Sequence, residues 1–358
     1  PGKGLPRQPF YRMETDMINR LVWMETDNTY PYRNLAMEEY MTLHVPQGTC
    51  ILYLWQNRHT VVIGKNQNCW RECRVNFLEQ EDGYLVRRLS GGGAVFHDLG
   101  NLNFTFIVGA GDYDVSRQLD VILEAVRSLG IHAEKTGRND ITVDGRKFSG
   151  NAFYRTGDGC YHHGTILIRA DKENMSRYLN VSKEKLASKG VTSVKSRVAN
   201  LCEFKPDITL EEVKSALVEA FSKVYGQPAV RMEEGELPQP DIDARTEKFA
   251  SWQWKYGRKI PFEYEMEKRF PWGNIQIQFH VDEGMIQDVN VFSDAMDQEM
   301  IGMLAEQLKG CAYAEEDICR AVKAVGTDAF QAGEYTGADE PQSCRIKEDI
   351  MTLVRESL

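Results

Sequence analysis

The sequence of 358 residues lacks the features that mark membrane, secreted and disordered proteins. No segment approaches the roughly 20 consecutive apolar residues that a membrane helix needs, and the N-terminus lacks the basic, apolar and small-residue order of a secretory signal. Glycine and proline number only 29 and 12, too few for a collagen-like or low-complexity chain. With 42% hydrophobic residues, the chain can bury a core. We expect a soluble globular protein, and the length favours two domains over one.

Metal-binding cysteine pairs and an excess of positive charge are also missing. The eight cysteines form no Cys-x-x-Cys pair of the kind found in zinc sites, and such scattered thiols fit a reduced, cytoplasmic protein. Lysine and arginine number 43 against 53 aspartate and glutamate residues, which gives a formal net charge of −10. This charge repels nucleic acid and anionic lipid, so neither is an expected partner. Any anionic ligand must be held by a local cluster of donors.

The chain divides into three segments. Residues 1–16 are polar, rich in proline and glycine and without periodicity, and we interpret them as a cloning remnant or a disordered N-terminus. Residues 17–262 form one long mixed domain in which strand-like and helix-like runs alternate. Residues 263–358 restart the pattern with two alternating runs, Ile275–Val281 and Met285–Phe292, followed by a helix face. This predicts a second, small α+β domain.

Local patterns predict several strands of the long domain. Cys50–Gln56 and Thr60–Gly64 are short apolar or β-branched runs whose spacing predicts paired strands around a tight turn. Ile141–Val143 and Lys147–Tyr154 flank Asp144-Gly145, a pair that tolerates the positive φ angles of a two-residue hairpin turn. The second hairpin matters because it carries a lysine on its return strand.

Two amphipathic helices are expected to cover the sheet that these strands form. Ser116 is the candidate cap of the first helix, which Gly130 ends. Thr209 and Glu212 form a capping box at the start of the second helix, which Gly226 ends. Strands and helices interleaved in this way predict a mixed α+β fold.

Three consecutive glycines, Gly91–Gly93, follow the predicted strand Leu85–Leu89, which contains Arg88. Glycine lets backbone N–H groups approach an anion closely, and the arginine adds a permanent charge with a planar fork of donors. We interpret the segment as a phosphate cradle, while a plain glycine turn remains the alternative. No Gly-Lys-Ser/Thr tripeptide follows, so it is not the P-loop of nucleotide triphosphatases.

The hairpin lysine, Lys147, is a candidate for stabilising an anionic transition state. A lysine on a rigid hairpin can be aimed at one point, although a solvated strand lysine is the more common case. Asp140 lies just upstream, and it could orient the lysine, hold Mg²⁺, bond a ligand or only cap a turn. The choice between these roles depends on what lies around the pair.

Three further features could be functional, but each also has a purely structural explanation. His162 and His163 enter a strand, where successive side chains face opposite sides, so only one of them can face a site. A zinc site would need further ligands that the sequence does not display. Cys160 has no obvious activating base, which favours an inert buried thiol over a nucleophile. The basic segment Asn180–Asn200 is either a charged surface loop or a loop that closes over an anionic intermediate.

Together these motifs resemble the lipoate–protein ligase A family within the biotin/lipoate ligases. The residues that carry the resemblance are Arg-Arg-x-Ser-Gly-Gly-Gly-Ala-Val-Phe-His-Asp-x-Gly-Asn over 87–101, Gly-Arg-Asn-Asp over 137–140, Lys-x-Ser-Gly-x-Ala over 147–152 and His-His-Gly-Thr over 162–165. Four motifs in the family's order are far more specific than any one of them. The similarity extends to Trp272-Gly273, and so includes the C-terminal accessory domain of the long bacterial form.

The resemblance implies a catalytic domain with mixed and antiparallel sheets flanked by helices, and a two-step reaction. In the family, (R)-lipoate and ATP with Mg²⁺ give lipoyl-adenylate and pyrophosphate, and a lysine of an acceptor domain then takes the lipoyl group. The implied acceptors are lipoyl domains of 2-oxoacid dehydrogenase complexes and the glycine-cleavage H protein. A carboxylate attacking an α-phosphate brings two anions together, so preplaced donors are the main catalytic resource. A monomer in the cytoplasm is the default.

The same resemblance assigns roles to individual residues. It implies that Lys147 and Arg88 are catalytic and that Asp140 is the candidate nearest the metal. The implied ATP-binding residues are Arg88, Gly93, Ala94, Val95, Phe96, Asp140 and Lys147. The implied lipoate-binding residues are Gly91, Gly92, His97, Lys147 and His163, and the loop that covers the adenylate includes Lys183, Lys189 and Gly190.

Two other functions stay open at this stage. The first is cysteine-dependent octanoyl or lipoyl transfer from a carrier protein; related acyltransferases place the cysteine upstream of the hairpin lysine, where this chain has no cysteine over 137–140. The second is a non-catalytic paralogue that binds lipoyl domains. Arg88, Gly93 and Lys147 together argue against it, because simple binding gives no chemical reason for a ring of charge. Ligation is therefore the favoured function.

Overall fold

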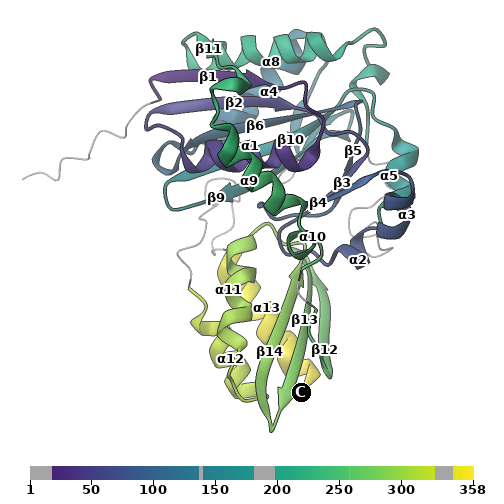
Figure 1. Cartoon of the computed structure of the whole chain (residues 1–358), viewed down its shortest axis with the longest axis vertical. Helices are drawn as coiled ribbons and strands as arrows, with labels where there is room; N and C mark the ends of the chain where they lie inside the picture. The colour runs from purple at the N-terminus through teal and green to yellow at the C-terminus, as the bar shows by residue number, and fades with distance from the viewer. Residues whose placement is uncertain (1–17, 137–139, 181–197, 258, 327–341) are drawn as a thin grey trace, which may run out of the picture.

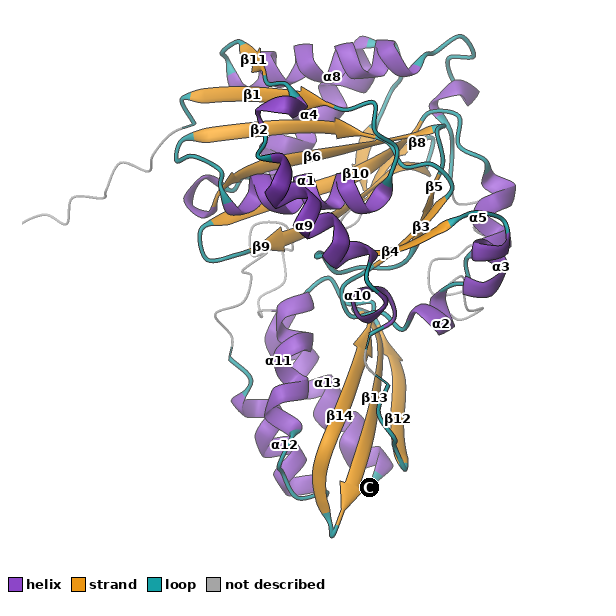
Figure 2. Cartoon of the chain, viewed as in Figure 1, coloured by secondary structure: helices purple, strands orange, loops and turns teal. Residues whose placement is uncertain are grey.

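The computed structural model describes residues 18–136, 140–180, 198–257, 259–326 and 342–358. The chain forms a larger part that contains two sheets and a smaller part that runs from β12 to the C-terminus (Figure 1). Figure 2 shows that helices flank the sheets in both parts, which confirms the predicted mixed α+β class. None of the described helices combines the length and apolarity needed to cross a bilayer.

An eight-stranded mixed sheet is the centre of the larger part. Its strand order is β11-β1-β2-β6-β10-β9-β8-β7. β1 pairs in parallel with β2 and β11, and the remaining pairs are antiparallel. The strands are β1 (Arg20–Glu25), β2 (Thr49–Trp55), β6 (Asn101–Gly109), β7 (Glu134–Thr136), β8 (Asp140–Val143), β9 (Arg146–Arg155), β10 (Gly159–Leu167) and β11 (Ala229–Arg231).

Two helix layers cover this sheet on opposite faces. The helices are α1 (Pro31–Leu43), α4 (Val115–Ser128), α8 (Leu210–Tyr225) and α9 (Gln239–Ala250). α4 and α8 pack on the face that carries Leu52, Phe104 and Phe106. α1 and α9 pack on the face that carries Tyr53 and Trp55. The alternation of β2 side chains between two packed cores explains why every residue of this strand is buried.

A second, three-stranded sheet lies beside the first and has the order β4-β3-β5. Its strands are β3 (Thr60–Ile63), β4 (Tyr84–Arg87) and β5 (Val95–His97). The prediction that Cys50–Gln56 and Thr60–Gly64 pair around a tight turn is therefore wrong, because they belong to different sheets. The connection is held by Asn57, which is fully buried and bonds to side chains on α1 and β5 instead of closing a turn.

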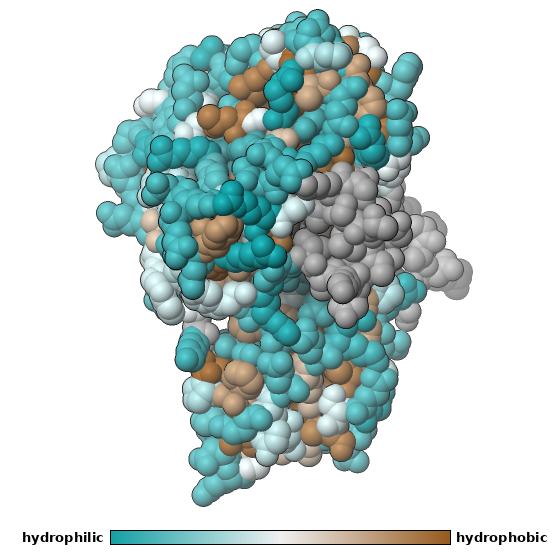
Figure 3. All heavy atoms as spheres, turned by 90° about the vertical axis from the view of Figure 1, so that its right-hand side faces the viewer, coloured by the Kyte–Doolittle hydropathy of each residue, from teal (hydrophilic) through white to brown (hydrophobic). Residues whose placement is uncertain are grey.

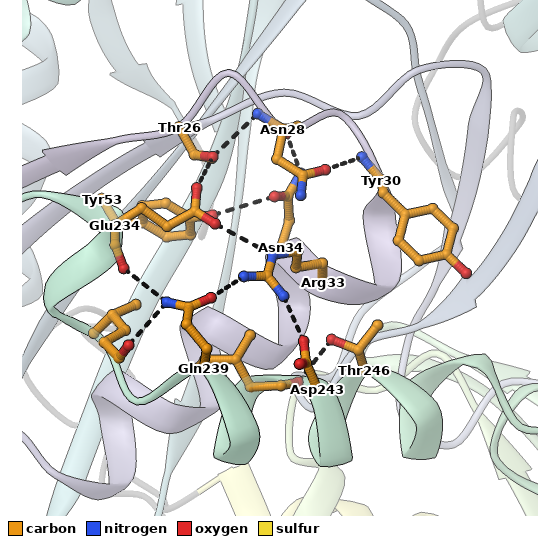
Figure 4. A network of polar contacts seen from close by, with 12 residues as sticks. Thr26, Asn28, Tyr30, Arg33, Asn34, Tyr53, Glu234, Gln239, Asp243 and Thr246 are labelled. Carbon is orange, nitrogen blue, oxygen red and sulfur yellow. Dashed lines mark hydrogen bonds and ion pairs between the residues drawn. The ribbon is translucent and has the colours of Figure 1, made fainter.

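Short elements complete the larger part. They are α2 (Cys69–Glu72), α3 (Val75–Gln80), α5 (Lys172–Tyr178), α10 (Trp252–Tyr256) and the 3₁₀ turns Ala110–Asp112, Leu201–Glu203 and Glu234–Glu236. Arg33 on α1 forms ion pairs with Glu234 and with Asp243 on α9, and Figure 4 shows these contacts from close by. These ion pairs attach the segment after β11 to α1.

Helix ends follow local chemistry. Thr209 and Glu212 form the predicted capping box of α8, and Gly226 ends that helix with a φ of 74°. Ser116 is not the cap of α4: the helix begins at Val115, and the Asp114 carboxylate accepts the Arg117 N–H at 3.0 Å. An aspartate at the N-cap also offsets the positive end of the helix dipole, which a serine does not.

The smaller part is an antiparallel sheet with helices on one face (Figure 2). Its strands are β12 (Tyr264–Phe270), β13 (Gly273–Asp282) and β14 (Met285–Ser293), in that order. Its helices are α11 (Gln298–Leu308), α12 (Glu315–Ala324) and α13 (Gln342–Ser357). β13 and β14 form a hairpin, whose turn has φ of 48° at Glu283 and 76° at Gly284. Seen from the right-hand side of Figure 1, the surface of both parts is mostly hydrophilic with small, separate hydrophobic patches (Figure 3).

Candidate active site

A cavity of about 320 Å³ lies between the two sheets of the larger part. It brings together most residues that the motifs singled out: Arg88, Gly92, Gly93, Ala94, Val95, Phe96, His97, Asp140, Lys147 and His163. The small part closes one side with Arg269, Pro271, Gly273, Asp294 and Met296. Sequence reasoning missed this contribution, since the small domain carries no recognisable catalytic motif.

Some expected positions lie elsewhere. Gly91 does not line the cavity, because it packs under the small part: an added Cβ would meet the carbonyl oxygens of Ala295 and Met296 at 2.5 Å. Lys183, Lys189 and Gly190 lie outside the described residues, as does the segment 137–139 of the Gly-Arg-Asn-Asp motif.

The hairpin of β8 and β9 positions the lysine. Asp144 and Gly145 have φ of 50° and 71°, as the predicted two-residue turn requires. Lys147 Nζ lies 2.6 Å from Asp140 Oδ1 on the neighbouring strand, and both side chains keep about a fifth of their surface exposed, 22% and 19%. The backbone of the lysine is fixed as well, since its carbonyl accepts the Ala199 N–H at 2.9 Å. The ammonium is thus held in the cavity wall by its own hairpin.

Arg88 holds the glycine loop from inside. Its Nη2 donates to the carbonyl oxygens of Gly91 at 2.6 Å and Gly93 at 2.9 Å, and its Nε donates to Ser90 Oγ at 2.9 Å. The side chain is only 5% exposed. Burial lowers the pKa of Arg88 to about 10, so the guanidinium keeps its charge at neutral pH. Its donors therefore shape the loop, and its positive charge lies directly behind the loop.

The glycine loop is in contact with the small part. Gly92 has a φ of 87°, which favours glycine, and its N–H donates to the Ala295 carbonyl at 3.0 Å. On its other side, an added Cβ on Gly64 would meet the Gly92 carbonyl at 2.2 Å. The loop is thus clamped between β3 and the small part, and one of its N–H groups is already bonded.

A chain of buried polar side chains leads from Arg88 to α1. Ser90 Oγ lies 2.8 Å from His163 Nε2, and His163 Nδ1 lies 2.8 Å from Glu38 Oε1. The Glu38 carboxylate also accepts the Thr105 hydroxyl at 2.7 Å. Glu38 is 1% exposed, and its side chain interacts electrostatically with the buried Arg88 guanidinium. Sequence reasoning missed it, because nothing in the sequence separates an acidic residue in a buried helix from a surface one.

The two adjacent histidines face opposite sides of β10, as predicted. His163 lines the cavity, whereas His162 points away from it and lies 2.8 Å from Asn151 Oδ1 and 3.2 Å from Gln118 Oε1. Burial lowers the pKa of His162 to about 3, and that of His97 likewise to about 3. Both rings are therefore neutral at physiological pH.

Cysteine and acidic residues bear on the alternatives of a cysteine nucleophile and a metal site. Cys160 is buried, as expected, and burial raises the pKa of its thiol to about 11, which disfavours the reactive thiolate. No cysteine is among the cavity residues of the described chain. Over the same ranges, no three His, Cys, Asp or Glu side chains converge as metal ligands. Asp140 is the one acidic side chain in the described lining that stands next to Lys147.

Comparisons with known proteins agree with this geometry. Residues 30–222 match the model of the lipoyl protein ligase A/B catalytic domain, and residues 259–337 match that of the bacterial lipoate protein ligase C-terminus. A lipoate-protein ligase A from Psychrobacter cryohalolentis is 41% identical over 298 residues, which cover 81% of this chain and 88% of that protein.

Two solved structures extend the similarity to the fold. The structure of Plasmodium falciparum LipL1 in complex with lipoate is 29% identical, has a TM-score of 0.79, and covers 93% of this chain and 99% of its own. A lipoate-protein ligase A bound with ATP is 25% identical with a TM-score of 0.57, and covers 67% and 99%. The catalytic and C-terminal matches together show that the chain is a ligase and belongs to the lipoate–protein ligase A family, in its long form with a C-terminal domain.

Proposed function

We propose that the protein is an ATP-dependent lipoate–protein ligase that forms lipoyl-adenylate and then acylates a lysine of an acceptor domain. The observation that carries the proposal is the ion pair of Lys147 and Asp140 in a cavity with two apolar arms, each defined by lining residues from a different hydrophobic cluster. Relatives whose structures contain lipoate or ATP support the two substrates.

The first arm suits an alkyl chain. Leu35, Trp55 and Val62 line it, and all three belong to one packed cluster of buried residues. The second arm borders another cluster, with Phe96, Leu167, Met175 and Leu179 in its wall, and is the proposed place of the adenosine. We therefore place the medium-chain acid on the first arm and the nucleotide on the second.

The proposed chemistry needs an ammonium in this cavity. In the first step the lipoate carboxylate attacks the α-phosphorus, a P–O bond forms, and the bond to pyrophosphate breaks. Negative charge gathers on the α-phosphoryl oxygens, and Lys147 is fixed in position to neutralise it. In the second step the amine of the acceptor lysine attacks the acyl carbonyl, and AMP leaves with the bonding electrons. No nucleophile of this chain is required.

Mg²⁺ would enter with ATP. Proteins bind this ion through one or two carboxylates together with substrate phosphates, and Asp140 is the carboxylate placed for that role. In this structure Asp140 is paired with Lys147 and orients its ammonium. We propose that Asp140 either orients Lys147 or binds Mg²⁺, and does not do both at once. The ion would screen the charge of the phosphates during the attack of the carboxylate.

The partners and the compartment are also part of the proposal. We propose that the acceptors are lipoyl domains of 2-oxoacid dehydrogenase complexes and the glycine-cleavage H protein, and that the enzyme acts as a cytoplasmic monomer. The proposed acceptors each present one lysine on a small folded domain. A panel of such domains, with the lysine replaced by arginine in each as control, would measure the preference.

The deciding experiment for the first step is direct. The purified chain is mixed with ATP, Mg²⁺ and lipoate and analysed by mass spectrometry for lipoyl-adenylate and pyrophosphate. Product that depends on all three components supports ligation. Acceptor modification that proceeds without ATP and disappears on cysteine alkylation would support the carrier-dependent transferase instead.

A further inference from the structure

We propose that His97 and Asn103 form a pair of uncharged donors that grips the carboxylate of the acyl substrate beside Lys147. The inference rests on the proposed function and gives the acid head group its place in the cavity. Both side chains line the cavity and are buried, with 4% and 1% of their surface exposed. Within the described part of the chain, His97 Nε2 and Asn103 Nδ2 have no hydrogen-bond partner. Two such donors in one cavity point to an acceptor on a ligand.

The surrounding amides determine which nitrogen of His97 carries the proton. Asn34 Nδ2 donates to the backbone carbonyl of Asn28 at 3.0 Å (Figure 4). It also donates to the Gln56 carbonyl at 2.8 Å, which identifies this atom of the Asn34 amide as the nitrogen. The same Nδ2 donates to Asn57 Oδ1 at 3.1 Å, which leaves Asn57 Nδ2 as the donor to His97 Nδ1 at 3.3 Å. The neutral ring therefore carries its hydrogen on Nε2, the atom without a partner.

The orientation of Asn103 follows in the same way. Its Oδ1 accepts the side-chain N–H of Asn101 at 2.9 Å, which leaves its Nδ2 unpaired. In the sheet, Asn103 is opposite Trp55 on one neighbouring strand and opposite Thr165 on the other. All three side chains line the cavity. Asn103 is thus one strand away from the apolar arm.

Thr165, the other neighbour of Asn103 in the sheet, lies close to the Lys147 ammonium. Thr165 Oγ1 accepts the Gly150 N–H at 3.2 Å, and a Cβ at Gly150 would lie 2.5 Å from Lys147 Nζ. Asn103 therefore lies between the apolar arm at Trp55 and the cationic corner at Lys147. An acid with a long alkyl chain places its carboxylate at such a boundary, because the chain favours the apolar side and the charge favours the cation.

Neutral donors suit the chemistry of the first step. A carboxylate bound to a full positive charge becomes a weaker nucleophile, whereas two N–H groups can hold one oxygen and leave the other free to attack. After the P–O bond forms and pyrophosphate leaves, the held oxygen becomes the acyl carbonyl oxygen. The same donors then polarise that carbonyl when the acceptor amine attacks it.

The test compares an acid with the matching alcohol. Calorimetry measures the affinity of the full chain, and of Asn103→Leu and His97→Phe, for lipoate and for the primary alcohol with the same dithiolane chain. We expect each variant to bind lipoate about tenfold more weakly, which corresponds to about 1.4 kcal/mol, and the alcohol within about twofold of the parent. Gln118→Leu is the matched control. Gln118 also has a buried side-chain amide nitrogen, Nε2, without a hydrogen-bond partner, but it lies on α4 and does not line the cavity.

The outcomes separate this inference from the proposed function. Equal losses for acid and alcohol, or no loss for either, in both variants would overturn the donor pair even if the parent chain makes lipoyl-adenylate. A parent chain that neither binds lipoate nor forms adenylate would instead refute the proposed function. Far-ultraviolet circular dichroism and thermal unfolding exclude variants that fail to fold, and the second variant keeps the test decisive if one of them does.

Discussion

The ammonium of Lys147 occupies the space that a side chain at position 150 would take. A Cβ added to Gly150 would lie 2.5 Å from Lys147 Nζ and 2.6 Å from its Cε. The absence of a side chain therefore lets the lysine fold back over its own strand and reach Asp140 at 2.6 Å. This contact gives a steric reason for the glycine in the Lys-x-Ser-Gly motif.

The first prediction concerns that contact. Gly150→Ala should push the ammonium out of place and lower kcat for adenylate formation by about 10²-fold, since a displacement of about 1 Å in a catalytic group has that effect. Gly157→Ala is the matched control, because a Cβ there meets nothing within 4 Å. Steady-state kinetics with pyrophosphate release as the readout would measure both. Equal rates in the two variants would contradict the steric account.

The second prediction concerns the charge itself. Lys147→Ala should lower kcat by about 10²–10³-fold, as expected for the loss of one electrostatic donor to a transition state, and leave the thermal unfolding midpoint nearly unchanged. Lys135→Ala is the control: Lys135 is paired with Asp120 at 2.8 Å and is 25% exposed, close to the 22% of Lys147, but lies outside the cavity. A similar loss in the control would show that removing any paired lysine of this domain is harmful.

The third prediction concerns the buried polar chain behind the glycine loop. Glu38→Gln keeps the shape of the side chain but removes an acidic group that interacts electrostatically with the buried Arg88 guanidinium. We expect the free energy of unfolding to fall by about 1–3 kcal/mol, and adenylate formation to slow. Glu39→Gln should cost less, because its partner Lys248 is 41% exposed and water can solvate it. Denaturant unfolding of both variants provides the comparison.

The fourth prediction concerns pH. Burial lowers the pKa of His97 and His162 to about 3. Between about pH 3 and 6.5 these two histidines are therefore protonated in the unfolded chain but neutral in the folded chain. The free energy of unfolding should therefore fall as pH decreases below 6.5, by up to about 2.7 kcal/mol per pH unit for the two groups together. Urea unfolding at pH 7.5, 6.5 and 5.5 measures the slope, and His162→Phe should reduce it by about half. Stability that rises as the pH decreases through this window would contradict the prediction.

Local chemistry allowed part of this fold to be predicted. The hairpin turn at Asp144-Gly145 and the capping box of Thr209 with Glu212 depend on neighbouring residues only, and both are confirmed. The adjacent histidines could also be assigned to opposite faces, because the alternation of a strand is local. Most of the described site residues predicted from the motifs also line the cavity.

Features that depend on distant contacts could not be predicted in this way. The separation of β2 and β3 into two sheets rests on Asn57, whose partners are on α1 and β5. The use of Arg88 to hold loop carbonyls, and the closure of the cavity by Asp294 and Met296, depend on tertiary packing. A sequence pattern records which donors are available, but the partner of each donor is decided by the assembled fold.

The central claim is that the site at Lys147 joins a carboxylate to AMP, and a crystal structure with a non-hydrolysable lipoyl-adenylate analogue tests it most directly. The account predicts the acyl phosphate mimic within hydrogen-bond distance of Lys147 Nζ, with the alkyl chain between Leu35 and Trp55. An analogue bound outside this cavity, or bound with its phosphate mimic away from the lysine, would contradict it.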